Sequence, residues 1–175
     1  MKSRQTRIQL LARQNIRRLR LPKFLSDASE VIGETIEPDA VLDIDTTDAV
    51  PERFVAGYKD AKTDAVPSFK QTFAMNEERR MLCLVDCLAH SLEDLCSLWL
   101  TYAEGEPIAV EIQLAGLLRR CKSAIKYDRD SISASSLDRS QGLLLDHNAD
   151  DAEFTYELTI WGDQWLNAVR NCELL

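Results

Sequence analysis

The sequence predicts a helix-dominated α+β fold. Two helical patterns occupy residues 76–102 and 108–127, and a strand pattern follows at residues 154–161. Because only a short turn separates the two helical patterns, we expect a central antiparallel αα-hairpin from about residue 76 to residue 127. A small antiparallel sheet that includes residues 154–161 would pack on this hairpin, and a basic N-terminal arm would precede it.

Charge divides the chain into three expected parts. Residues 1–23 form a basic amphipathic arm that contains eight Lys and Arg residues and no acidic residue. Residues 24–52 form an acidic linker or edge segment that contains nine Asp and Glu residues and no Lys or Arg. Residues 53–175 are expected to form a single globular α+β domain, since a chain of this length and 45% hydrophobic content can bury one core. The net charge of −8 therefore conceals a strongly basic segment.

The arm is expected to form an amphipathic helix that ends at Pro22. Its apolar residues fall on one side of such a helix: Ile8, Leu11, Ala12, Ile16 and Leu19. Its arginines are the candidates for binding an anionic surface: Arg4, Arg7, Arg13, Arg17, Arg18 and Arg20. Clustered guanidinium groups bind phosphate on nucleic acid or on an anionic membrane, because they supply paired donors and displace counterions.

Two other interpretations of the arm stay open. The arm could lie against acidic protein surface, its own or a partner's, and the adjoining acidic segment favours its own because the tether is short. An Arg-rich segment without acidic residues is also typical of a cleaved organellar transit peptide.

The acidic segment is expected to be a partly extended loop, with Val41, Leu42 and Ile44 as a short edge strand. Its candidate partner-binding residues are Glu37, Asp39, Asp43, Asp45 and Asp48. Such a run could cover a basic partner, as inhibitors, immunity proteins and antitoxins do, or it could simply be solvated.

The central helix is predicted from apolar residues at steps of four and three: Met81, Val85, Leu88, Leu92, Leu95, Trp99 and Tyr102. The second helix is predicted from Val110, Leu114, Leu117, Leu118, Cys121 and Ile125, although the alternation at residues 108–114 leaves a strand start open. Residues 128–152 are rich in Ser and Asp and are expected to be mainly loop. Alternating Phe154, Tyr156, Leu158 and Ile160 predict a strand, and residues 165–172 predict a short final helix.

The five cysteines are expected to be reduced thiols in a cytosolic interior, because their number is odd and no C-x-x-C pair occurs. Cys83, Cys87 and His90 share one face of the predicted central helix and are weak candidates for a zinc site or a Cys–His nucleophile pair. No tight ligand pair or orienting group accompanies them, so we predict no metal, no cofactor and no catalytic residue.

The sequence thus favours a non-enzymatic interaction protein, a subunit or adaptor of a larger, nucleoprotein or phage-type assembly. It would dock through the arm on another protein, with nucleic acid as a further partner. The alternatives are an acidic inhibitor of a basic protein and a zinc-dependent enzyme. Charges at Asp86, Glu93 and Asp94 interrupt the longest apolar run, so no membrane span is expected, and no secretory signal is evident. The expected location is cytoplasmic.

Overall fold

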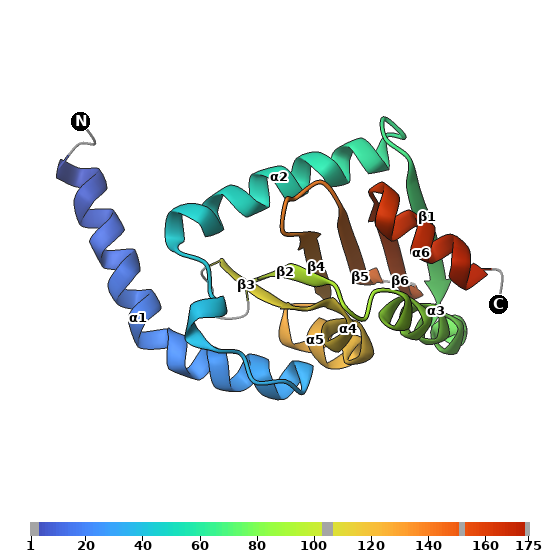
Figure 1. Ribbon diagram of the computed structural model, residues 1–175, viewed down its shortest axis with the longest axis horizontal. Helices are drawn as coiled ribbons and strands as arrows, with labels where there is room; N and C mark the ends of the chain where they lie inside the picture. The colour runs from blue at the N-terminus through green and yellow to red at the C-terminus, as the bar shows by residue number, and fades with distance from the viewer. Residues whose placement is uncertain (1–3, 103–106, 151–152, 174–175) are drawn as a thin grey trace.

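Six strands form one antiparallel sheet in the computed structural model, which describes residues 4–102, 107–150 and 153–173 (Figure 1). The strands are β1 (Ser68–Ala74), β2 (Cys96–Thr101), β3 (Ile108–Gln113), β4 (Ser131–Ser136), β5 (Gly142–Asp150) and β6 (Glu153–Trp161). Their order across the sheet is β1-β6-β5-β4-β2-β3. The predicted α+β class is confirmed, and so is the strand at residues 154–161.

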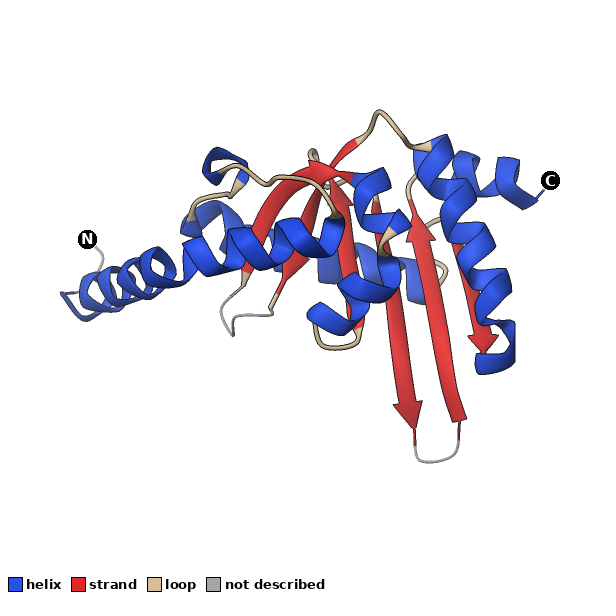
Figure 2. Cartoon of the chain, turned by 90° about the horizontal axis from the view of Figure 1, so that it is seen from below, coloured by secondary structure: helices blue, strands red, loops and turns tan. Residues whose placement is uncertain are grey.

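Helices cover both faces of this sheet. They are α1 (Arg4–Ile32), α2 (Ile44–Lys62), α3 (Glu78–Ser91), α4 (Leu114–Arg119), α5 (Cys121–Tyr127) and α6 (Asp163–Glu173), with short 3-10 turns at Pro38–Ala40 and Met75–Glu77. Helix α2 packs on one face, and the second half of α1 together with α3–α6 packs on the other, where the largest core lies (Figure 1). Figure 2 shows the long β5–β6 pair extending past the neighbouring helices.

The predicted αα-hairpin is wrong, because Cys96–Thr101 and Ile108–Gln113 form the antiparallel strands β2 and β3. Helix α3 ends at Ser91, and β2 pairs with β3 so that Trp99 lies opposite Val110. Five of the six residues of β2 are buried, so both of its faces are covered. A strand buried on both faces has a continuous apolar sequence, which periodicity cannot distinguish from a buried helix.

Two further expectations in this half of the chain are corrected. The second helical pattern begins as strand β3 and becomes helical only at Leu114, so the alternation at residues 108–114 was the relevant signal. Residues 128–152 are not mainly loop, because β4 and β5 run through them. Serines of β4 such as Ser135 and Ser136 are buried in the sheet, which their polarity alone does not predict. The short final helix is confirmed as α6.

Helix α1 does not end at Pro22 but continues to Ile32. Proline removes one backbone hydrogen bond and bends a helix where packing holds both sides. Here Phe24, Ala28 and Ile32 are buried at helical spacing beyond it, and Figure 1 shows α1 changing direction part-way along. The helix therefore runs across the expected boundary at residue 23.

The acidic segment is mostly helical rather than extended. Its two ends belong to α1 and α2, and α2 continues past the expected boundary at residue 52. The expected edge strand is reduced to one bridge between Val41 and Val110 and a hydrogen bond from the Leu42 N–H to the Ala109 carbonyl at 2.9 Å. Ile44 already begins α2.

The position of α2 on the sheet depends on Trp161. Its ring lies 5.2 Å from the ring of Phe54, measured between centroids. A Cβ atom added to Gly57 of α2 would come within 2.6 Å of Trp161 Nε1, and one added to Gly142 of β5 would overlap the same ring. Two glycines thus make room for the indole, which is 4% exposed. Trp99, Trp161 and Trp165 are all buried.

Candidate functional site

The candidate site is a cleft of about 710 Å³ between the first half of α1 and the segment that leads into α2. We call it the arm cleft. Leu10, Leu21, Leu25 and Ile44 supply apolar walls, and Arg17, Arg18, Asp43 and Asp45 supply charges. A cleft of this size with apolar walls and a few polar groups is typical of a binding site. It brings together arginines of the arm and aspartates of the acidic segment, which is the intramolecular arrangement that the sequence left open.

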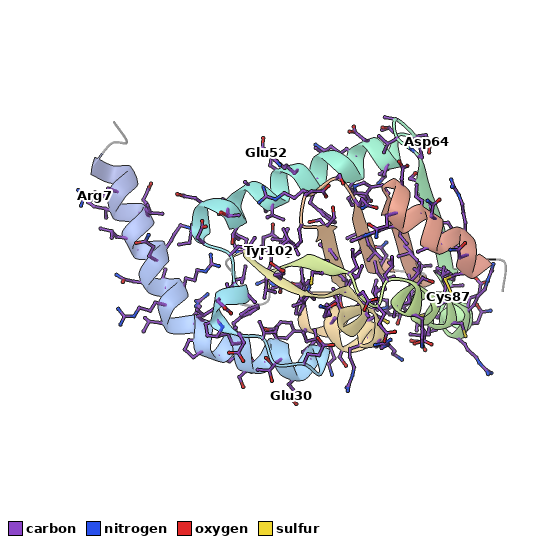
Figure 3. All side chains as sticks on the ribbon, in the orientation of Figure 1. Arg7, Glu30, Glu52, Asp64, Cys87 and Tyr102 are labelled. Carbon is purple, nitrogen blue, oxygen red and sulfur yellow. A yellow bond between two sulfur atoms is a disulfide. The ribbon has the colours of Figure 1, made fainter. Side chains whose placement is uncertain are left out.

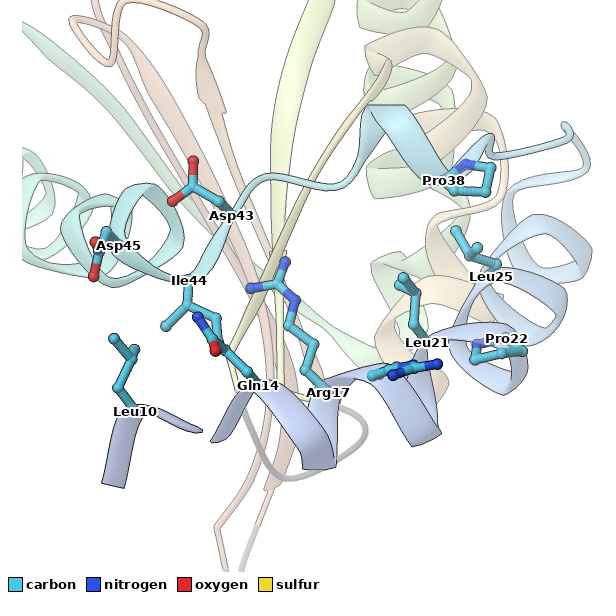
Figure 4. Close-up of a pocket in the computed structure, with 11 residues that line it drawn as sticks. Leu10, Gln14, Arg17, Leu21, Pro22, Leu25, Pro38, Asp43, Ile44 and Asp45 are labelled. Atoms are coloured by element: carbon cyan, nitrogen blue, oxygen red, sulfur yellow. The ribbon is translucent and has the colours of Figure 1, made fainter. Parts of the chain in front are cut away.

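Arg17 crosses the cleft (Figure 4). Its Nη2 donates to the carbonyl of Leu42, and its Nη1 donates to Thr47 Oγ1 at 3.4 Å. Burial lowers the pKa of the Arg17 guanidinium, while the Asp43 carboxylate opposes this shift. The side chain therefore ties α1 to the start of α2 instead of facing an external anion.

Arg13 makes the second connection. Its guanidinium donates to both carboxylate oxygens of Asp48, at 2.7 and 2.8 Å. Hydrogen bonds from Arg13 lower the pKa of the Asp48 carboxyl. The two side chains are 33% and 42% exposed, so water screens the pair and it stabilises the fold only modestly.

Asp43 has a structural role as the N-cap of α2. Its carboxylate accepts from the backbone N–H of Thr46 at 2.8 Å and from the Thr46 hydroxyl at 2.8 Å. These hydrogen bonds lower the pKa of the Asp43 carboxyl. Asp43 and Asp48 thus have partners within the chain. The other three predicted acidic residues, Glu37, Asp39 and Asp45, are exposed.

The five apolar residues that the sequence placed on one side of the arm face away from the body. Ile8 is 61% exposed, Leu11 50%, Ile16 39% and Leu19 82%, and Ala12 is exposed beside them. We call these five residues the outward stripe. The half-buried residues Leu10, Arg13, Arg17 and Leu21 lie on the opposite side of the same helix. The arm therefore turns Arg13 and Arg17 toward the protein and the outward stripe toward solvent.

Three of the remaining predicted arginines flank this stripe, and Arg18 among them also lines the arm cleft. Arg7, Arg18 and Arg20 are exposed, and Figure 3 shows Arg7 at the end of α1 that is remote from the sheet. Arg4 begins α1, but its side chain lies outside the described residues.

Sequence reasoning missed the inner side of the arm, although a signal for it exists. Leu10, Arg13, Arg17 and Leu21 recur at steps of three, four and four, which is a second helical stripe. The acceptors on the opposite wall, the Leu42 carbonyl and Thr47, gave no sequence signal.

The expectation of reduced thiols is wrong for Cys87, which forms a disulfide with Cys172. Helix α6 packs against α3 and brings together two cysteines 85 positions apart, a pairing that sequence spacing does not reveal. Cys87 is therefore unavailable as a metal ligand beside Cys83 and His90. The Nδ1 atom of His90 lies 2.8 Å from the Asp86 carbonyl, and no group of three metal-binding side chains occurs within the described part of the chain.

Comparison with known proteins does not place the chain in a family. No family model, curated protein or solved structure matches it. Within residues 4–102, 107–150 and 153–173, no helix has both the length and the apolar character needed to cross a membrane.

Proposed function

We propose that the protein is a non-enzymatic interaction protein, a subunit or adaptor of a larger assembly, that docks on another protein through the outward stripe of α1. The observation that carries this proposal is the orientation of the arm. Leu19, Ile8 and Leu11 are at least half exposed on one helix face, while Arg13 and Arg17 hold the opposite face to the body. Exposed apolar surface at helical spacing is typical of a partner-binding helix.

The composition of this face favours a protein partner over nucleic acid. Phosphate backbones are bound by cationic and polar donors, and they offer nothing to bury apolar side chains. In the arm, Arg13 and Arg17 are committed to Asp48, Thr47 and the Leu42 carbonyl. The exposed Arg7 and Arg18 border the outward stripe. The matching partner surface is apolar at its centre and acidic at its rim.

The proposal is tested by site-specific photocrosslinking of the full chain in its native host. A benzophenone side chain at position 19 or position 11 should give a discrete crosslinked protein. The matched control is position 55, since Val55 of α2 is 44% exposed and lies outside the arm. Leu19→Glu should abolish the crosslink formed from position 11. Equal crosslinking from positions 11, 19 and 55 would contradict the proposal.

Binding of the full chain to duplex DNA and RNA across a salt series tests the nucleic-acid alternative. We expect that any binding of the chain to DNA or RNA is lost in the Leu19→Glu variant. An affinity that falls steeply with salt, by about 0.9 log units per log unit of salt for each phosphate contacted on duplex DNA, and that Arg18→Ala weakens, would instead indicate a nucleoprotein subunit.

A further inference from the structure

A second cavity, distant from the arm, contains three cysteines. It lies where α3, β1 and α6 meet and has a volume of about 450 Å³. Cys83, Cys87 and Cys172 line it together with Arg80, Leu84 and Phe73. Figure 3 marks Cys87 at this end of the molecule. Three sulfur atoms in one cavity are a chemical feature that the proposed docking function does not use.

The cysteines of this cavity are in different oxidation states. Cys87 and Cys172 form the disulfide between α3 and α6, whereas Cys83 is a free and exposed thiol. Cys83 lies four residues before Cys87, on the same face of α3 one turn away. An accessible thiol beside a disulfide has the arrangement needed for thiol–disulfide exchange.

The other two free thiols differ from Cys83. Cys121 is buried, and burial raises its pKa to about 11, so almost none of it is thiolate near neutral pH. Cys96 of β2 does not line the cavity, and its Sγ accepts a hydrogen bond from Gln113 Nε2 at 3.3 Å. Cys83 is therefore the free thiol placed to reach the disulfide.

We propose that Cys83 exchanges with the Cys87–Cys172 disulfide, so that α6 can be linked covalently to either of two successive turns of α3. The Cys83 thiol loses its proton to water, and the thiolate attacks the Sγ of Cys172. A Cys83–Cys172 bond forms as the Cys87–Cys172 bond breaks. The electron pair of the broken bond leaves on Cys87, which takes a proton from water. The exchange is redox-neutral and needs no external oxidant or reductant.

Cys172 is the sulfur that is attacked, because the alternative product is less favourable. A Cys83–Cys87 bond would join positions i and i+4 of one helix, whose Cβ atoms lie about 5–6 Å apart, whereas a disulfide needs about 3.5–4.5 Å. Cys172 lies in the last turn of α6, beyond the buried anchors Trp165 and Val169. The exchange requires that turn to shift by about one turn along α3 while the anchors stay in the core.

The experiment labels the oxidised full-length protein with N-ethylmaleimide under native conditions without reductant, then maps the label. Cleavage before Asp64, Asp86, Asp94 and Asp163 places Cys83, Cys87, Cys96 and Cys172 in separate peptides. Cys87 can be labelled only in molecules in which its disulfide has opened. We expect label on both Cys83 and Cys87, and a disulfide-linked pair of peptides 64–85 and 163–175.

Cys83→Ser is the matched control, and in this variant the labelling of Cys87 should be lost completely. Label confined to Cys83 and Cys96 in the unmodified protein would overturn the proposal, since it would show a static disulfide. Labelling of Cys87 that persists in Cys83→Ser would overturn it as well, because the bond would then open without Cys83. A Cys96–Cys172 linkage as abundant as Cys83–Cys172 would indicate random re-pairing and would have the same consequence.

Discussion

Replacing Asp128 by asparagine should stabilise the protein at neutral pH. Asp128 follows α5 and is 4% exposed. Its Oδ1 accepts from Thr101 Oγ1 at 2.8 Å and from the backbone N–H of Tyr102 at 2.7 Å, at the end of β2. Burial raises the pKa of the Asp128 carboxyl from 3.8 to about 6, against these two hydrogen bonds and the nearby charge of Arg129, which lower it.

The sign and size of the effect follow from this pKa. The folded state holds the Asp128 proton more tightly than the unfolded state, so its contribution to stability is present at low pH and is lost as pH rises through about 6. Raising the Asp128 pKa from 3.8 to about 6 corresponds to a loss of about 3 kcal/mol of stability at neutral pH, of which about 1 kcal/mol falls between pH 5 and pH 7. Asparagine keeps the Oδ1 acceptor and removes the buried charge.

Urea unfolding of both proteins between pH 5 and pH 8 measures the difference. The stability advantage of Asp128→Asn should grow by about 1 kcal/mol between pH 5 and pH 7 and then level off. Asp128→Ala is the control, because it leaves Thr101 and Tyr102 without their acceptor and should gain less than asparagine at every pH. A difference between Asp and Asn that does not change with pH would refute the assignment of a raised pKa to Asp128.

Three further perturbations test other parts of the structure. A double-mutant cycle on Arg13 and Asp48 should give a coupling free energy below about 1 kcal/mol in urea unfolding, because both side chains are partly exposed. A larger value would mean that water screens this ion pair less than its exposure indicates. Gly142→Ala should cost about 1–3 kcal/mol by overlap with Trp161, and much of this cost should disappear in the Trp161→Ala background. Cys172→Ser should lower the free energy of unfolding by about 4 kcal/mol, because it opens a loop that spans 85 positions, and dithiothreitol should then have no further effect.

The fold class could be predicted from the sequence, but strands β2 and β4 in the middle of the chain could not. The alternation at residues 154–161 identified β6, one face of which belongs to the core. Strand β2 is buried on both faces, so its apolar run continued the stripe of α3 without a visible break. Residues 131–136 look like a loop by composition, yet their serines lie within a buried strand whose neighbours are β2 and β5. Burial of this kind depends on which strands become neighbours, and local sequence does not specify that.

The charged residues of the candidate site could be predicted from the sequence, but the side of the arm that faces the body could not. The sequence identified Arg13 and Arg17 in the arm and Asp43 and Asp48 in the acidic segment. Which side of the arm would face the body depended on the Leu42 carbonyl and on Thr47, whose positions follow from the start of α2. The disulfide was missed for a similar reason, since only the packing of α6 on α3 brings its two sulfur atoms together.

The orientation of the arm explains why a basic segment is followed directly by an acidic one. Residues 7–20 extend from the buried second half of α1, beyond the bend near Pro22, so contacts on their inner side fix how they lie against the body. Arg13 and Arg17 provide those contacts, and their acceptors lie in the acidic segment. Part of the opposite charge of these two neighbouring segments is therefore paired within the chain, and the surface left for a partner is the outward stripe with the exposed Arg7 and Arg18 beside it. Binding through that stripe should depend mainly on apolar burial, which salt screens little, so raising the salt concentration should weaken partner binding far less than Leu19→Glu does.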